Sequence, residues 1–128
     1  MMIFKFLNKI FNKNKINDER PKLLEFTFDN EKILALYDNM GLRTIYYHDL
    51  KNIFIIFYDE DNPIPLWNFV SEEYYISVQN DFPIDFKKLI NTLTEKLTNF
   101  DNTAYEQIIN AMGASNGLFH IWNNEKGT

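Results

Sequence analysis

The side chains that could do chemistry are few in this chain and stand far apart. Its two histidines are His48 and His120, and neither has a carboxylate at the spacing of a catalytic pair or a zinc site. Asp49 directly follows His48, but adjacent residues do not form such a pair. The chain has no cysteine, which excludes a thiol nucleophile, a thiolate metal site and a disulfide framework. We therefore expect a non-enzymatic protein without a catalytic, cofactor or metal site.

Acidic residues form the densest group of one kind. Asp59, Glu60 and Asp61 precede Asn62 but lack the spacing and the glycine of a calcium-binding loop. They form either a solvated turn or a contact surface for a basic partner. The alternative contact surface for such a partner is the later acidic and aromatic segment that begins at Glu72. The predicted partner-binding residues are Asp59, Glu60, Asp61, Glu72, Glu73 and Tyr74.

Charge divides the chain into two parts. Residues 1–22 have a net charge of +4, from six basic and two acidic residues, whereas residues 23–128 have −9, from seven basic and sixteen acidic residues. An acidic domain repels nucleic-acid phosphates and attracts basic proteins. We therefore expect a protein partner, such as a basic toxin domain, and no nucleic acid. The alternative is that the charge serves solubility alone.

Residues 1–13 have the pattern of an amphipathic helix. One face is apolar and consists of Ile3, Phe4, Phe6, Leu7, Ile10 and Phe11. Lysines within the segment and the lack of a cleavage site argue against a signal peptide, so we expect a cytoplasmic protein. Three alternatives remain open: the helix packs on its own domain, it binds a membrane surface or a partner, or the segment is disordered. A polar linker follows, so the predicted domains are 1–22, helix and linker, and 23–128, a single α+β domain.

From Leu23 onward the apolar residues recur with the period of two that is typical of strands. Residues 52–58 are apolar throughout, which predicts a central strand covered on both faces. We expect an α+β fold in which an antiparallel sheet of about six strands packs on two C-terminal helices, and a closing strand rejoins the sheet. The predicted strands are residues 24–29, 32–37, 43–47, 52–58, 65–70, 73–78 and 118–122.

Two helices are predicted between the last two strands. Asp85 is the expected N-cap of the first, and Thr103 with Glu106 fits a capping box for the second. A break separates the helices at residues 100–102, and Gly113 or Gly117 ends the second. The residues expected in the core at this end of the chain are Phe100, Ile109, Met112 and Trp122.

The segment from His48 to Trp122 resembles a family of small, mostly uncharacterised bacterial cytoplasmic proteins. Its most specific part has the form FDN…IxAM…F-x-x-W. The matching residues are Phe100, Asp101, Asn102, Ile109, Ala111, Met112, Phe119 and Trp122. Some members of this family resemble immunity proteins of contact-dependent or polymorphic toxin systems. The signature residues are fold determinants, so the resemblance implies a fold and a class of function but no site.

The sequence therefore favours a non-catalytic cytoplasmic binding protein, an immunity protein that neutralises a bacterial toxin by direct binding. The alternative is a structural or regulatory protein held at the inner membrane, or on a partner, by its N-terminal helix. An adjacent gene for a large secreted protein with a variable C-terminal domain would favour the first.

Overall fold

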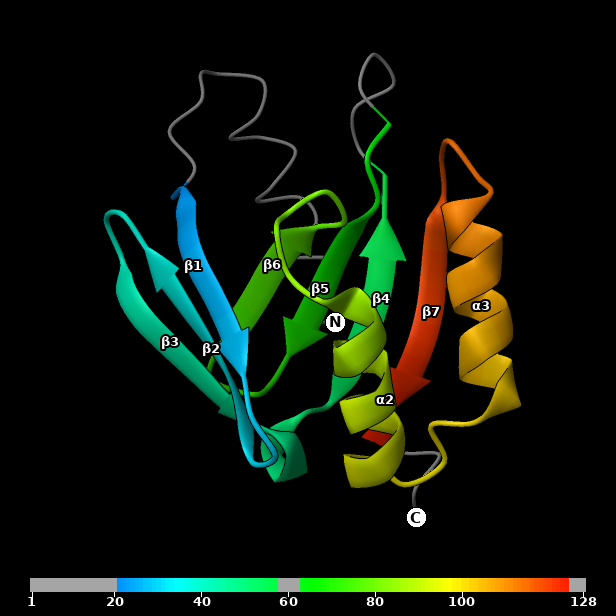
Figure 1. Ribbon diagram of the computed structural model, residues 1–128, viewed down its shortest axis with the longest axis horizontal. Coiled ribbons are helices and arrows are strands. Elements are labelled where there is room, and N and C mark those ends of the chain that lie inside the picture. Colours follow the sequence, from blue (N-terminus) through cyan, green and yellow to red (C-terminus); the bar gives the residue numbers. More distant parts are fainter. Residues whose placement is uncertain (1–20, 58–62, 125–128) are drawn as a thin grey trace.

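Seven antiparallel strands and two helices form an α+β fold in the computed structural model, which describes residues 21–57 and 63–124 (Figure 1). The strands belong to two sheets, so the prediction of one sheet of about six strands is wrong. Sheet A has the order β1 (Leu23–Phe28), β2 (Lys32–Tyr37), β3 (Gly41–Tyr46). Sheet B has the order β6 (Tyr75–Gln79), β5 (Leu66–Val70), β4 (Asn52–Ile56), β7 (Leu118–Asn123).

The helices α2 (Phe86–Lys96) and α3 (Asn102–Met112) both pack on one face of sheet B, and α3 lies beside β7 (Figure 1). The predicted closing strand is confirmed, since β7 pairs with β4. The predicted N-terminal helix, residues 1–13, lies outside the described residues. Neither α2 nor α3 is long and apolar enough to cross a membrane.

A short 3₁₀ helix, η1 (Tyr47–Asp49), separates the two sheets. The Tyr47 hydroxyl donates to the carbonyl oxygen of Asp29 at 2.7 Å, and the Tyr47 backbone N–H donates to that of Glu31 at 3.0 Å. These bonds fix the corner against the turn between β1 and β2. Leu50, 1% exposed, then anchors the chain where it enters β4. The chain therefore leaves sheet A at this corner and begins a second sheet.

Side chains of sheet A reach the outer edge of sheet B. Arg43 on β3 donates from Nη1 to the carbonyl oxygen of Tyr75 at 2.9 Å, and the backbone N–H of Ser77 donates to the hydroxyl oxygen of Tyr37 at 3.2 Å. Both backbone groups lie on the edge of β6 that faces away from β5. The side chains of Arg43 and Tyr37 thus form hydrogen bonds that a further strand would otherwise form with this edge of β6. Burial raises the pKa of the Tyr37 hydroxyl above its ordinary value.

The main core lies between sheet A, the two helices and the inner face of sheet B, which is the face toward the helices. Trp67 is central to it. Its ring stacks against Phe69 and Phe86, with centroids 6.1 and 5.7 Å apart, and Phe69 meets Phe26 of sheet A at 6.1 Å. The prediction that the central strand is covered on both faces is confirmed, because residues 53–56 of β4 are all buried.

Asp85 caps α2 as predicted, since its side chain accepts from the backbone N–H of Lys88 at 3.0 Å. The prediction that Thr103 caps α3 is wrong. Asp101 is the N-cap, and its carboxylate accepts from the backbone N–H of Thr103 at 3.0 Å. A carboxylate one position before the helix satisfies this N–H directly, so Thr103 lies inside the first turn. Gly113 ends α3, as predicted.

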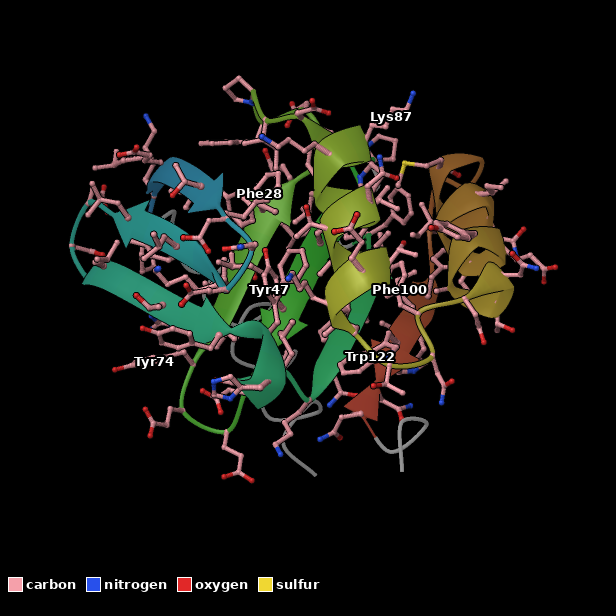
Figure 2. All side chains as sticks on the ribbon, turned by 60° about the horizontal axis from the view of Figure 1, so that its bottom comes forward. Phe28, Tyr47, Tyr74, Lys87, Phe100 and Trp122 are labelled. Atoms are coloured by element: carbon pink, nitrogen blue, oxygen red, sulfur yellow. The ribbon has the colours of Figure 1, made fainter. Side chains whose placement is uncertain are left out.

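Two of the four residues expected in the C-terminal core are buried. Phe100 and Trp122 point into the region between α2 and α3, and the indole N–H of Trp122 donates to the carbonyl oxygen of Thr98 at 2.8 Å (Figure 2). The prediction is wrong for Ile109 and Met112, which are 69% and 40% exposed. The helix buries Ala104, Ile108 and Ala111 instead. This spacing of three and four residues defines a single face of a helix, and Ile109 lies about 100° away from Ile108.

Tyr47 makes the stability of the fold sensitive to alkaline pH. Burial, and to a lesser degree the Asp29 carboxylate, raise the pKa of Tyr47 to about 12, against about 10 in an unfolded chain. A raised pKa contributes stability that is complete below pH about 10 and is lost as the pH rises toward 12. We expect the free energy of unfolding, from urea denaturation at a series of pH values, to fall across this window. Tyr47→Phe should flatten the fall; an equal slope in both proteins would exclude Tyr47 as its source.

Candidate protein-interaction surface

The structure describes three of the six predicted partner-binding residues. Glu72, Glu73 and Tyr74 form the exposed turn between β5 and β6, whereas residues 59–61 lie outside the described residues. The connection from β4 to β5 and the turn from β5 to β6 must leave opposite ends of β5. Five strand residues separate those ends by about 15 Å.

The turn, which we call the acidic turn (residues 71–74), is held in one shape by Ser71. The backbone N–H of Ser71 donates to the carbonyl oxygen of Tyr74 at 2.8 Å. Its hydroxyl accepts from the Tyr74 N–H at 3.0 Å and donates to the Tyr74 carbonyl oxygen at 3.1 Å. Ser71 itself is buried. Because the backbone is already ordered, a partner would bind Glu72 and Glu73 without first fixing the turn.

Further charges lie next to the acidic turn. The backbone N–H of Lys51 donates to the carbonyl oxygen of Val70 at 2.8 Å, which brings the end of η1 to the turn. The ammonium of Lys51 lies 3.9 Å from a carboxylate oxygen of Glu72, whose side chain is 80% exposed. Such an exposed ion pair is weak, so it leaves the Glu72 carboxylate available to a partner. Asp49 in η1 adds a third carboxylate to those of Glu72 and Glu73, so the area around Lys51 is acidic.

Tyr74 connects the acidic turn to sheet A. The guanidinium of Arg43 lies 5.7 Å from the centroid of the Tyr74 ring and 4.9 Å from that of Tyr75. Tyr74 nevertheless remains 43% exposed, at the rim of the molecule beside β3 (Figure 2). An oriented tyrosine with an exposed face is a common anchor in protein–protein interfaces.

The outward face of sheet A carries exposed leucines. This apolar surface was not predicted from the sequence. Leu42 and Leu24 are 62% and 52% exposed. Leu36 is half-buried and pairs directly with Leu42 across the strands. We call Leu24, Leu34, Leu36 and Leu42 the leucine face. It is the face of sheet A opposite to Arg43, whose side chain contacts Tyr75 on β6. One signal was available in the sequence: β2 is apolar at almost every position, although only one of its faces contacts the core.

A smaller apolar area lies on α3, where Ile109 and Met112 are exposed. Leu118, at the start of β7, is 38% exposed. Glu106, which is also exposed on α3, lies three residues before Ile109 and is therefore its neighbour on the helix surface. This area thus offers mainly apolar contact with an acidic side chain beside it.

The two histidines lie on different elements, His48 in η1 and His120 on β7. His48 stacks on Tyr46, with ring centroids 5.6 Å apart, and its Nδ1 lies 3.1 Å from the Asp49 carboxylate. His120 lies on β7, opposite Phe54. Within residues 21–57 and 63–124, no three His, Asp or Glu side chains are grouped to hold a metal ion. No protein-family model, curated protein or solved structure matches this chain.

Proposed function

We propose that this chain is a non-catalytic, cytoplasmic immunity protein that neutralises a bacterial toxin by direct binding. The observation that supports this proposal is the ordered and exposed acidic turn, and the leucine face of sheet A offers an exposed apolar surface on the same molecule. The acids would attract a basic partner and the leucines would be buried on contact. Residues 48–122 resemble a family of small bacterial proteins of which some members resemble immunity proteins, and this supports the choice of a toxin as that partner.

The two parts of the surface would have different effects on binding. Complementary charge speeds association and selects the partner, whereas buried apolar contact mainly slows dissociation. A nuclease toxin, whose own surface attracts phosphate, would present the basic surface that Glu72 and Glu73 require. Covering that surface would prevent the toxin from binding its substrate.

The first test is genetic. We expect an adjacent gene to encode a large secreted protein with a variable C-terminal domain. Production of that C-terminal domain in a bacterial host should stop growth, and co-production of this chain should restore it. Growth arrest that this chain does not relieve would contradict the proposed function.

The second test measures association of the purified C-terminal domain at several ionic strengths. We expect Glu72→Lys with Glu73→Lys to slow association about tenfold at low salt, and less at high salt. The matched control is Glu95→Lys with Glu106→Lys, which changes the net charge equally but on exposed positions of α2 and α3. Equal slowing by both pairs would assign the effect to net charge and remove the acidic turn from the interface.

The same measurement separates the two acidic groups. Asp59→Lys, Glu60→Lys and Asp61→Lys, made together, reverse the charge at the other end of β5. If this triple variant alone is slowed at low salt, the partner binds at the β4–β5 connection instead. The proposal that the acidic turn contacts the toxin would then be wrong, while neutralisation itself would stand.

A further inference from the structure

The middle of the outer face of sheet B, the face that points away from α2 and α3, is largely apolar and buried on β4 and β5. Strand alternation places Phe54 and Ile56 of β4 and Leu66 and Val70 of β5 on this face. They are 0%, 5%, 6% and 4% exposed, within a single chain. None of the four belongs to the main core, which takes its residues of β4 and β5 from the opposite face.

A polar side chain in the same strip is equally buried. Asn68 lies between Leu66 and Val70 on β5 and is 0% exposed. Its amide nitrogen donates to the carbonyl oxygen of Leu66 at 3.1 Å, and its oxygen accepts from the Ser77 hydroxyl at 2.6 Å. A buried amide needs such partners within the protein, because water does not reach it. The strip is therefore covered, and both described helices lie on the other face.

The width of the covered strip indicates what covers it. On the strands that flank β4 and β5, the outward side chains are more accessible: Gln79 on β6 and His120 and Leu118 on β7 are exposed. The buried strip is thus two strands wide, which corresponds to about 10 Å. This is the diameter of one α-helix with its side chains.

We propose that the amphipathic segment of residues 1–13 lies as a helix along β4 and β5 on this outer face. The segment carries six large apolar residues on one helical face, listed above, and as a helix would be about 20 Å long. Residues 14–22 can span about 30 Å when extended, enough to reach from β1 to the strip. The two other segments outside the description, 58–62 and 125–128, are short and mostly polar.

Charge supports the same occupant. The polar face of the segment carries lysines, which would remain in solvent above an acidic domain. The apolar face would meet the strip formed by residues 54, 56, 66 and 70. The helix is then a second cover for the central strand β4, opposite α2.

Crosslinking in the full chain tests this placement, because the natural sequence contains no cysteine that could interfere. Lys9→Cys is combined with His120→Cys or with Gln79→Cys, at the two exposed rims of the strip. A short bismaleimide should then link the pair within one molecule. The matched control combines Lys9→Cys with Glu106→Cys on α3, on the opposite side of sheet B, and should give no intramolecular link.

The crosslinked product shows whether the strip is covered by residues 1–13 of the same molecule, by a second copy, or by neither. An intramolecular link to either rim, and none to the control, is the expected result. A link between two molecules would overturn the proposal in favour of a second copy. No link to either rim, with sedimentation of the full chain on anionic lipid vesicles, would assign the segment to a membrane surface.

A second measurement does not depend on the position of the cysteines. Phe6→Asp with Ile10→Asp places charges on the apolar face, and Lys9→Asp is the control on the polar face. We expect the apolar variant, in the full chain, to lower the urea midpoint and to expose the strip to a hydrophobic dye. The control should change neither property. Unchanged stability and dye binding in the apolar variant would overturn the docking, without bearing on whether the chain neutralises a toxin.

Discussion

Trp122→Ala should lower the free energy of unfolding by about 3–5 kcal/mol, the range for a buried tryptophan. The ring is 5% exposed and lies between the two helices and sheet B. Its indole N–H also donates to the carbonyl oxygen of Thr98 at 2.8 Å, so the change leaves that oxygen without its partner. Urea denaturation gives the value. Trp122→Phe keeps much of the apolar contact and should lose less.

The matched controls are two consecutive isoleucines of α3. Ile108 is 7% exposed and Ile109 is 69% exposed. We expect Ile108→Ala to cost about 2–4 kcal/mol and Ile109→Ala less than about 0.5 kcal/mol. An unchanged midpoint for Trp122→Ala, or equal costs for the two isoleucines, would contradict the packing of α3 against sheet B.

Arg43→Ala should lower the free energy of unfolding by about 2–3 kcal/mol, because it removes a charged hydrogen bond between the two sheets. The guanidinium donates to the carbonyl oxygen of Tyr75 and lies over the rings of Tyr37, Tyr74 and Tyr75. Arg43→Lys keeps the charge but lacks the planar fork, so we expect it to recover only part of the loss.

Urea denaturation with tyrosine and tryptophan fluorescence measures the effect of the Arg43 changes. Hydrogen exchange at the backbone N–H of Ser77 should also accelerate in Arg43→Ala, because the edge of β6 would be less protected. A variant with normal stability and normal protection at Ser77 would show that the two sheets do not depend on this contact.

The strands and helices were largely predictable because each is specified locally. Alternating apolar residues end at turns such as 29–31 and 38–40, and these limits agree with the structure within about two residues. The division into two sheets was not predictable in the same way. It depends on η1 and on Arg43 reaching β6, and contacts between residues so far apart leave no periodic pattern in the sequence.

The core at the C-terminal end shows the same limit. Ile108, Ile109 and Met112 are all apolar, and which of them faces the sheet depends on the rotation of α3 about its axis. The small residues Ala104 and Ala111 occupy the contact with β7 and β4 and let the helix approach closely. Because large apolar residues are the usual core residues, Ile109 and Met112 were predicted to be buried, and the smaller alanines were not.

The candidate surface was predictable in part. The turn after the strand of Trp67 was predicted and is present, with Glu72 in it. Glu73 and Tyr74 were predicted to begin the next strand, but they belong to the turn, because β6 begins at Tyr75. The leucine face was not predicted, because apolar strand residues were assumed to face a core. Leu42 was assigned to no strand, although Gly41, with φ of 75°, begins β3 one residue before it.

The pairing of β7 with β4 has a consequence during synthesis on the ribosome. The strand β4 (Asn52–Ile56) leaves the exit tunnel long before β7 (Leu118–Asn123), while β5 and β6 follow it directly. The nascent chain can therefore form the β4–β5–β6 meander early, but one edge of its most apolar strand stays open until β7 emerges. We expect this interval to be when the chain depends most on chaperones. A premature stop codon before Leu118 would make the open edge permanent.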